Sequence, residues 1–291
     1  MEGLPETLSR SMERINRMRA KGSDGSPPKA AAANSNATSD PDVPKCPYGL
    51  CNGSGAYGKT GDDGKPYGVV CECLKLTLMQ SQMKFAAIPE EFGGLRVSDF
   101  DTGVYTGHNR KTAEAVKKMA IGYVNKFEHM KAMGRGLYLY GEAKGSGKTR
   151  MAVSIGNALI RQHRQTVRFI TTVNFLNEIK STFNGSINED GFSKLLEAAK
   201  TVDVLILDDL GVERPTDWVG EMFYAVLNDR MVGKMVTIFT SNCRVEELRH
   251  DARLVDRILR MAMPIKFPDE SVRLKFAKSE NEQMLKMLME N

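Results

Sequence analysis

From about Ile88 to the C-terminus, the chain alternates between helical and strand-like patterns of apolar residues. Helical spacing covers residues 111–133, 149–163, 173–183, 192–200 and 217–231. Short apolar runs typical of buried strands lie between them, at residues 136–140, 167–172, 202–207 and 235–240. Strands that alternate with helices predict a largely parallel sheet with helices on both faces. We therefore expect an α/β fold over residues 86–291.

The N-terminal residues follow a different pattern. An amphipathic helix is predicted within residues 1–21, with one apolar face made of Leu4, Leu8, Met12, Ile15 and Met18. Such a short helix is marginally stable alone, so it either docks on a partner or frays in solvent. Residues 22–44 contain one branched apolar residue, Val43, and we expect them to form a flexible linker.

The composition of the 291 residues, with 41% apolar and 26% charged residues, suits a protein with a sizeable core. It excludes a wholly disordered chain, a collagen-like fibre and a disulfide-rich miniprotein. The sequence has no apolar signal-peptide region at its start and no run of 18 uncharged apolar residues, so we expect a cytoplasmic protein without a membrane partner. The 41 lysines and arginines against 36 acids give a net charge of +5, which permits a nucleic-acid partner without arguing for one.

Four of the five cysteines fall within 28 residues, as the pairs Cys46/Cys51 and Cys71/Cys73 separated by 19 residues. Two short pairs joined by a hairpin-sized insert suit a tetrahedral Zn²⁺ site, since each pair can turn two thiolates toward one ion. The alternatives are two disulfides or four free thiols, and a cytoplasmic location disfavours the disulfides. We expect a structural zinc unit over residues 45–85, because four thiolate ligands leave no position for water.

A glycine-rich loop follows the strand predicted at 136–140, with the sequence Gly141-Glu-Ala-Lys-Gly145-Ser-Gly147-Lys148-Thr149. Between a strand and a helix, such a loop turns its backbone N–H groups onto phosphates, and the helix N-terminus adds a positive dipole end. Lys148 is expected to reach the β- and γ-phosphates of ATP and the Thr149 hydroxyl to bind Mg²⁺. The strict pattern requires glycine at position 142, where this chain has Glu142. The predicted ATP-binding residues of the loop are Lys144, Gly145, Ser146, Gly147, Lys148 and Thr149.

A second predicted strand ends in two carboxylates, Asp208 and Asp209. The carboxyl ends of parallel strands meet at one edge of the sheet, so these acids are expected beside the glycine-rich loop. Asp208 suits ATP-bound Mg²⁺, together with Thr149. Asp209 can orient or deprotonate the attacking water.

Three further polar residues are candidates for the same chemistry. Asn242 follows the strand at 235–240, where its amide can bind a γ-phosphate or the attacking water. Arg257 and Arg273 lie on predicted helical segments, and a guanidinium can stabilise charge on a transferring phosphoryl group. Taken alone, each arginine fits a surface ion pair better.

The segments GEAKGSGKT, VLILDDLG, TSN, ARLVDRI and SVRLK together resemble the AAA+ module of replicative-helicase loaders of the DnaC/DnaI type, over about residues 86–280. A cysteine-rich unit ahead of the ATPase is similar to DnaI-type loaders, although the C-x4-C spacing departs from the commoner C-x2-C. The fold implied is an AAA+ P-loop NTPase, preceded by a small zinc-binding unit and a tethered helix.

The resemblance also implies roles for single residues. Lys148 and Thr149 would be Walker A residues and Asp208 and Asp209 Walker B residues. Asn242 would be sensor 1, Arg257 the arginine finger with Arg253 as the alternative, and Arg273 sensor 2. Many AAA+ proteins have glutamate where Asp209 stands, and the shorter side chain suits a slow, switch-like ATPase.

The partners implied are single-stranded DNA, a hexameric DnaB-type helicase and further copies of the chain in an ATP-dependent oligomer. The N-terminal region would contact the helicase. Transposition-helper ATPases of the IstB type share nearly the same motifs and are the alternative, although they lack the zinc unit. A P-loop small-molecule kinase and a nucleic-acid-binding module with an inactive ATPase fit the motif order less well.

Overall fold

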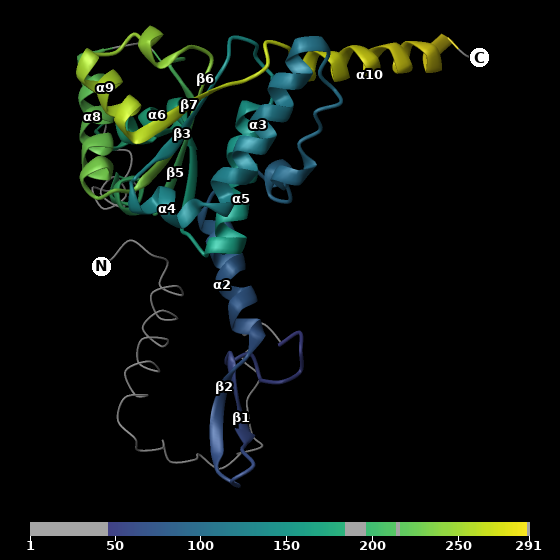
Figure 1. Ribbon diagram of the computed structural model, residues 1–291, viewed down its shortest axis with the longest axis vertical. Helices are drawn as coiled ribbons and strands as arrows, with labels where there is room; N and C mark the ends of the chain where they lie inside the picture. Colours follow the sequence, from purple (N-terminus) through teal and green to yellow (C-terminus); the bar gives the residue numbers. More distant parts are fainter. Residues whose placement is uncertain (1–45, 184–195, 214–215, 290–291) are drawn as a thin grey trace. The chain divides into compact units, whose positions relative to one another are not determined.

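The computed structural model describes residues 46–183, 196–213 and 216–289. The chain divides into two compact units, Met1–Ser81 and Gln82–Asn291 (Figure 1). The predicted N-terminal helix and linker (1–21 and 22–44) lie outside the described residues, and the domain boundaries drawn from the sequence stay predictions. Of the helix predicted at 192–200, the described part is helical from 196 to 201.

The first unit contains an antiparallel hairpin of β1 (Ala56–Thr60) and β2 (Pro66–Val70). Its turn closes where the Gly61 N–H donates to the Lys65 carbonyl at 2.9 Å. Helix α2 (Glu72–Phe85) begins directly after the hairpin and continues into the second unit. The two predicted cysteine pairs therefore stand on either side of the hairpin, before β1 and after β2.

The second unit is built on a five-stranded parallel sheet. Its strand order is β4-β5-β6-β3-β7, so the chain crosses from β3 to the far edge and returns through the middle. The strands are β3 (Gly136–Tyr140), β4 (Val167–Thr171), β5 (Val204–Leu210), β6 (Val236–Ser241) and β7 (Ala262–Lys266). The predicted α/β fold with a parallel sheet is confirmed.

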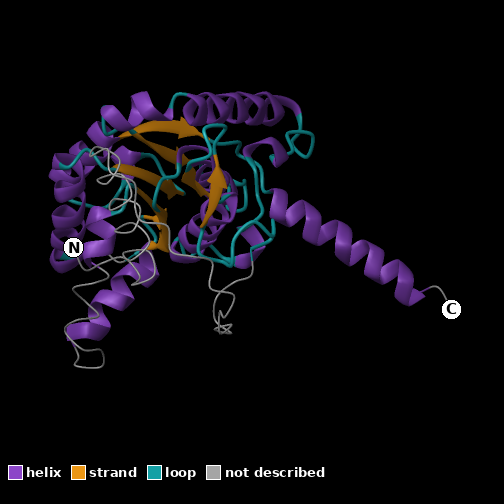
Figure 2. Ribbon diagram, turned by 90° about the horizontal axis from the view of Figure 1, so that it is seen from below, coloured by secondary structure: helices purple, strands orange, loops and turns teal. Residues whose placement is uncertain are grey.

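Helices cover both faces of this sheet (Figures 1 and 2). One face carries α3 (Gly107–Asn125) and α5 (Lys148–His163), with the short α4 (Phe127–Ala132) after α3. The other face carries α6 (Thr172–Phe183), α8 (Asp217–Val232) and α9 (Ala252–Met261). A continuous core packs between the sheet and this second group, including Phe175, Phe223 and Ile258. Single 3-10 turns lie at Glu90–Phe92, Val97–Asp99 and Val245–Glu247.

Two elements differ from the sequence-based expectation. The helix predicted over 111–133 is broken at Lys126, whose ψ of 19° leaves the helical range and lets Phe127 begin a separate helix. Strand β7 was not predicted, because Ala-Met-Pro-Ile-Lys has no clean alternation and contains Pro264. Proline fits only an edge strand, and β7 lies at the edge beside β3.

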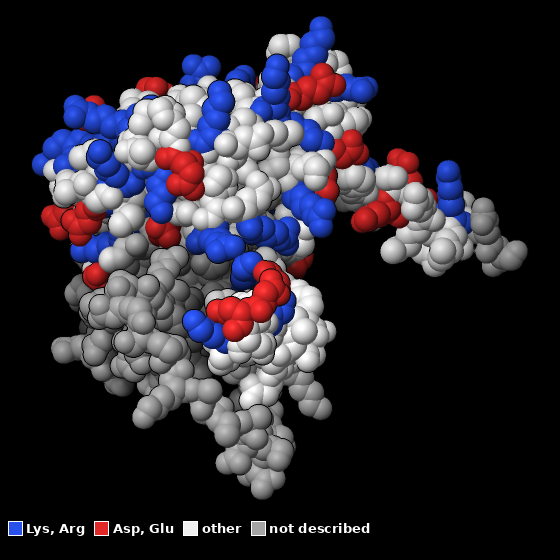
Figure 3. Space-filling model, turned by 60° about the horizontal axis from the view of Figure 1, so that its bottom comes forward, with Lys and Arg blue, Asp and Glu red and all other residues white. Residues whose placement is uncertain are grey.

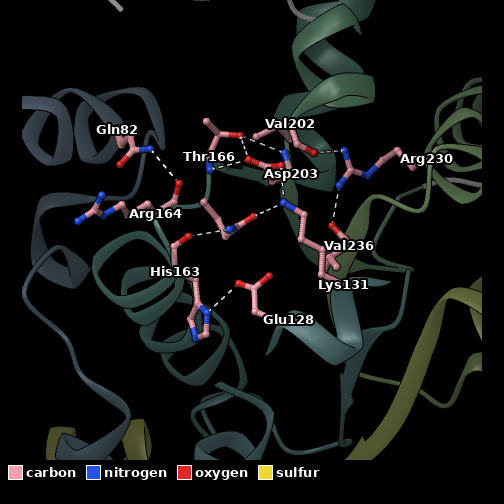
Figure 4. Close-up of polar contacts among 11 residues, drawn as sticks. Gln82, Glu128, Lys131, His163, Arg164, Thr166, Val202, Asp203, Arg230 and Val236 are labelled. Carbon is pink, nitrogen blue, oxygen red and sulfur yellow. Dashed lines mark hydrogen bonds and ion pairs between the residues drawn. The ribbon is translucent and has the colours of Figure 1, made fainter. Parts of the chain in front are cut away.

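Polar side chains join the starts of the central strands (Figure 4). Asp203, directly before β5, accepts hydrogen bonds from Thr166 Oγ1 at 2.7 Å and Lys131 Nζ at 2.9 Å. Arg230 on α8 is fully buried and donates to the carbonyls of Val202 (2.9 Å) and Val236 (2.6 Å). Burial lowers the pKa of Arg230 to about 9. These bonds fix the amino ends of the strands, so the opposite edge is the one open to a ligand.

Helix α10 (Val272–Met289) extends away from the sheet, as Figure 2 shows. None of its residues is buried, and its last turns expose the apolar side chains of Met284, Leu285, Met287, Leu288 and Met289. Across the described ranges, no helix combines the length and apolar character needed to cross a bilayer.

Candidate nucleotide-binding site and cysteine cluster

The glycine-rich loop joins the end of β3 to the start of α5, as the sequence predicts. Gly145 (φ 77°) and Gly147 (φ 91°) both adopt the left-handed conformation that glycine allows at low cost. A Cβ added at Gly147 would lie 2.9 Å from the Phe100 ring, and one at Gly145 would lie 2.8 Å from Arg273 Cβ. Tyr105 Oη also donates to the Ser146 carbonyl at 2.8 Å. Neighbouring side chains thus fix the loop from outside.

Replacing Gly145 or Gly147 with alanine is therefore expected to destabilise the second unit by about 1–3 kcal/mol and to weaken ATP binding. Each new Cβ adds backbone strain and a clash with a neighbouring side chain. Thermal melting and ATP affinity measure the two effects. Gly220→Ala on α8 is the matched control, since a Cβ there meets open space and alanine favours a helix. Equal melting temperatures of the Gly147→Ala and Gly220→Ala proteins would contradict the expected strain at Gly147.

Lys148 is the first residue of α5 and is only 5% exposed. Its Nζ donates to the carbonyls of Gly141 (2.8 Å) and Ala143 (3.0 Å), so the ammonium lies inside the curve of the loop. Burial lowers the pKa of Lys148, and the nearby carboxylates of Asp209 and Asp208 oppose that effect. Glu142, which replaces the glycine of the strict pattern, is exposed, and its side chain therefore needs no space inside the loop.

The two acids of β5 lie at the same sheet edge as the loop. Asp208 is 4% exposed, and its Oδ1 accepts hydrogen bonds from Thr149 Oγ1 at 2.8 Å and from Thr240 Oγ1 at 2.6 Å. Burial raises the pKa of Asp208, while both hydroxyl donors favour its charged form. Asp209 has a left-handed φ of 56°. The Thr149 hydroxyl and the Asp208 carboxylate are oxygen ligands of the kind that Mg²⁺ requires, so the donor set fits this ion.

The four clustered cysteines of the first unit converge as predicted, and none forms a disulfide. The Sγ atoms of Cys46, Cys51, Cys71 and Cys73 all lie within 4.8 Å of one another. Burial would raise the pKa of Cys46, but backbone N–H donors from Cys51 and its neighbours lower that pKa to about 6. Burial and the adjacent thiols raise the pKa of Cys73. Four thiolates this close need a cation between them, so the cluster could hold Zn²⁺.

Comparison with known proteins agrees with the geometry of the nucleotide site. Residues 80–280 match the family model described as IstB-like ATP binding protein. The chain belongs to this IstB-like family. Replicative helicase loader DnaI of Bacillus subtilis (strain 168) is 36% identical over 155 residues, which cover 48% of this chain and 48% of DnaI. The match therefore spans about half the length of that relative.

Solved structures of the same kind match the IstB-like module. A crystal structure of DnaI superposes with a TM-score of 0.51 at 28% identity, covering 66% of this chain and 98% of that one. A crystal structure of the DnaC helicase loader gives a TM-score of 0.52 at 22% identity, over 62% of this chain and 99% of that one, and shares the fold. The likeness to DnaC/DnaI proteins expected from the motifs is confirmed, and family membership supports ATP binding.

Within this IstB-like module, the arginines occupy two places. Arg273 lies at the loop, because the backbone N–H groups of Val272 and Arg273 donate to the Gly145 carbonyl at 3.0 and 3.4 Å. Arg257 instead contacts α8, where its guanidinium lies 3.8 Å from the Tyr224 ring and donates to Asn228 Oδ1 at 2.8 Å.

Arg253 lies one helical turn before Arg257, and its side chain is 75% exposed. It pairs with Asp251 and lines an open cavity of about 540 Å³ together with Tyr224 and Leu254. The contacts of Arg253 and Arg257 are with α8 and the start of α9, so neither arginine is brought to the loop of its own chain. Their assignment as fingers stays a prediction.

Sequence reasoning missed two residues that shape the site. Thr240 contacts both acids of β5, and Tyr105 hydrogen-bonds the loop from the segment before α3. A threonine two residues before Asn242 gives no signal of its own, since only the strand order places β6 between β5 and β3. Asn242 itself follows the last residue of β6, at the predicted edge.

Proposed function

We propose that this IstB-like protein is an ATP-dependent loader that places a hexameric DnaB-type helicase on single-stranded DNA. One observation carries the proposal: over 155 residues, 48% of its length, the chain is 36% identical to a replicative helicase loader. The cysteine cluster in the same chain supports it, because this unit separates DnaI-type loaders from transposition helpers. In this proposal, ATP binding and hydrolysis switch the assembly.

In this proposal, each residue of the site has its own role in ATP hydrolysis. Lys148 would neutralise the β- and γ-phosphates, while Thr149 and Asp208 would bind Mg²⁺. Bound Mg²⁺ supplies charge neutralisation on the phosphate oxygens. Asp209 would accept a proton from the attacking water, and Asn242 would orient that water or the γ-phosphate. With an aspartate in this position, hydrolysis is expected to be slow and stimulated by DNA or by assembly.

An arginine on α9 is expected to complete the site of a neighbouring copy. Arg257→Ala should lower hydrolysis by at least about 100-fold without weakening ATP binding in the monomer, because a finger in trans acts only in the assembly. Mixing Arg257→Ala with Asp209→Asn should restore part of the activity, since some mixed sites then hold an intact finger and an intact acid.

The same mixing experiment with Arg253→Ala separates the two candidate arginines. Arg257 is tied to Tyr224 and Asn228 of its own chain, whereas Arg253 is exposed, and only the true finger should complement Asp209→Asn. Failure of both mixtures would argue against a finger in trans. ATP turnover per chain is the measurement, with Lys126→Ala as an unrelated exposed control.

Single-stranded DNA is the proposed substrate of the assembled loader. Lysine and arginine side chains are scattered over the face shown in Figure 3, among acidic and uncharged residues, and such side chains can contact phosphates. Affinity for a fluorescent oligonucleotide, measured with ATP, with ADP and over a range of salt, tests this part. Binding independent of salt and nucleotide would contradict it.

Helicase binding decides between the two leading functions. A pull-down with a hexameric replicative helicase should capture the full chain and lose most of it when residues 1–81 are removed. Absence of binding by both forms would favour the alternative, a transposition-helper ATPase, which the IstB-like family model itself supports. ATP-dependent binding to double-stranded DNA would then be the next measurement.

A further inference from the structure

Thr240 connects the two acidic residues at the end of β5. It lies on β6, is fully buried, and donates its hydroxyl proton to Asp208 Oδ1 at 2.6 Å. The same oxygen accepts the backbone N–H of Asp209 at 2.9 Å. One hydroxyl thus acts as a donor to the first acid and as an acceptor for the second, the two roles available to it.

An irregularity in β5 creates the need for this hydroxyl. Leu207 pairs with Phe239 and Leu210 with Ser241, so β5 has one more residue than β6 across this interval. The extra residue bulges, and Asp209 adopts its left-handed φ of 56° there. Its N–H finds a side-chain oxygen, Thr240 Oγ1, in place of a ladder carbonyl. Beyond the bulge, Ser241 Oγ donates to the Leu210 carbonyl at 2.7 Å and closes the irregular segment.

Asp208 is oriented by two hydroxyls that come from different elements. Thr149 Oγ1 on α5 and Thr240 Oγ1 on β6 both donate to Oδ1, at 2.8 and 2.6 Å. Two donors on one oxygen restrict the rotation of the carboxylate and hold Oδ1 between α5 and β6. Thr149 is itself a proposed Mg²⁺ ligand, so its hydroxyl and that carboxylate are set at a fixed relative position.

We infer that Thr240 is the positioning residue of the nucleotide site, which sets the Asp208 carboxylate for Mg²⁺ and the Asp209 carboxylate for the attacking water. This inference rests on the proposed ATPase function. Thr240 does not touch ATP in this role, because both of its hydrogen bonds go to the acids. Removing its hydroxyl leaves the Asp209 N–H without an acceptor and Asp208 with one donor fewer.

The test compares Thr240→Val, which keeps the shape and removes the hydroxyl, with Thr240→Ser, which keeps the hydroxyl. Affinity for a fluorescent ATP analogue is measured with Mg²⁺ and with EDTA, beside single-turnover hydrolysis. Thr240→Val should lose about 10–100-fold in the Mg²⁺-dependent part of the affinity and at least as much in hydrolysis rate. Its affinity in EDTA should stay near that of the wild type, and Thr240→Ser should restore most of both losses.

Thr237→Val is the matched control for a purely structural effect. Thr237 lies on the same strand, is equally buried, and accepts a hydrogen bond from Arg230 Nε at 3.0 Å at the opposite end of β6. It should lower the melting temperature and leave the Mg²⁺ dependence unchanged. If Thr240→Val does not fold, Thr240→Ala makes the same comparison with a smaller side chain.

A folded Thr240→Val or Thr240→Ala with wild-type Mg²⁺ dependence would overturn the inference, as would equal Mg²⁺ effects of Thr237→Val. A wild-type protein that binds ATP equally with Mg²⁺ and with EDTA would instead contradict the proposed function on which the inference rests. The two failures are therefore distinguishable.

Discussion

Replacing Lys148 with alanine is expected to abolish ATP turnover, with a loss of at least about 100-fold. The ammonium lies inside the loop, bound to two loop carbonyls and shielded from solvent, where a positive charge acts more strongly on phosphates than it would in water. The one other lysine on this loop is Lys144, which is exposed.

ATP affinity and zinc content test whether the effect of Lys148→Ala is confined to the nucleotide site. Affinity for ATP should fall together with turnover, and the zinc content of the first unit should stay at that of the wild type, because the substitution touches only the second unit. Lys126→Ala, which removes an exposed lysine after α3, should leave both unchanged. Undiminished hydrolysis by Lys148→Ala would contradict the assignment of the glycine-rich loop as the phosphate-binding loop.

Replacing Cys71 or Cys73 with serine is expected to release zinc and unfold the described part of the first unit. Both cysteines are buried, and the described residues of the unit place a two-stranded hairpin and the start of α2 around them. Zinc binding contributes roughly 10–16 kcal/mol to the folded state of zinc-finger peptides, and replacing one of four thiolates weakens that binding. A hairpin of this size is not stable alone.

Zinc per chain and the rate of tryptic cleavage within residues 46–81 measure this loss. ATP binding should survive, since the core of the second unit contains none of the four ligands. Cys243→Ser is the matched control, because Cys243 lies beside Ser241 in the second unit and is expected to leave one zinc per chain. A Cys71→Ser protein that still contained stoichiometric zinc would refute the four-cysteine site.

Much of the sheet and of the nucleotide site could be predicted because the signals are local. A buried strand followed by a glycine-rich turn predicts a phosphate-binding loop, and one followed by two acids predicts a Mg²⁺ site. Both predictions hold wherever the strand lies in the sheet. The departure at Glu142 is visible in the sequence, but the exposure of its side chain is not, since that exposure depends on how the loop turns.

Other features depend on partners that are remote in the sequence. The role of Thr240 follows from an extra residue in the neighbouring strand, and a bulge has no signature in a run such as Val-Leu-Ile-Leu-Asp-Asp. The difference between Arg253 and Arg257 follows from the hydrogen bonds that Arg257 donates to Tyr224 Oη and Asn228 Oδ1, on two residues one turn apart on α8. Strand β7 could not be predicted from the sequence, because an edge strand needs little alternation of apolar and polar residues.

The contact between the glycine-rich loop and the base of α10 has a consequence for any molecule that binds this helix. The first amides of α10 donate to the Gly145 carbonyl, and Lys275 Nζ donates to the Val104 carbonyl at 2.9 Å, while no residue of this helix is buried. Any molecule that binds α10 and alters the affinity for ATP by some factor must itself be bound more tightly or more weakly by that same factor once ATP is present. For a ligand of α10 with such an effect, its affinity measured with and without ATP would report the nucleotide state of the site.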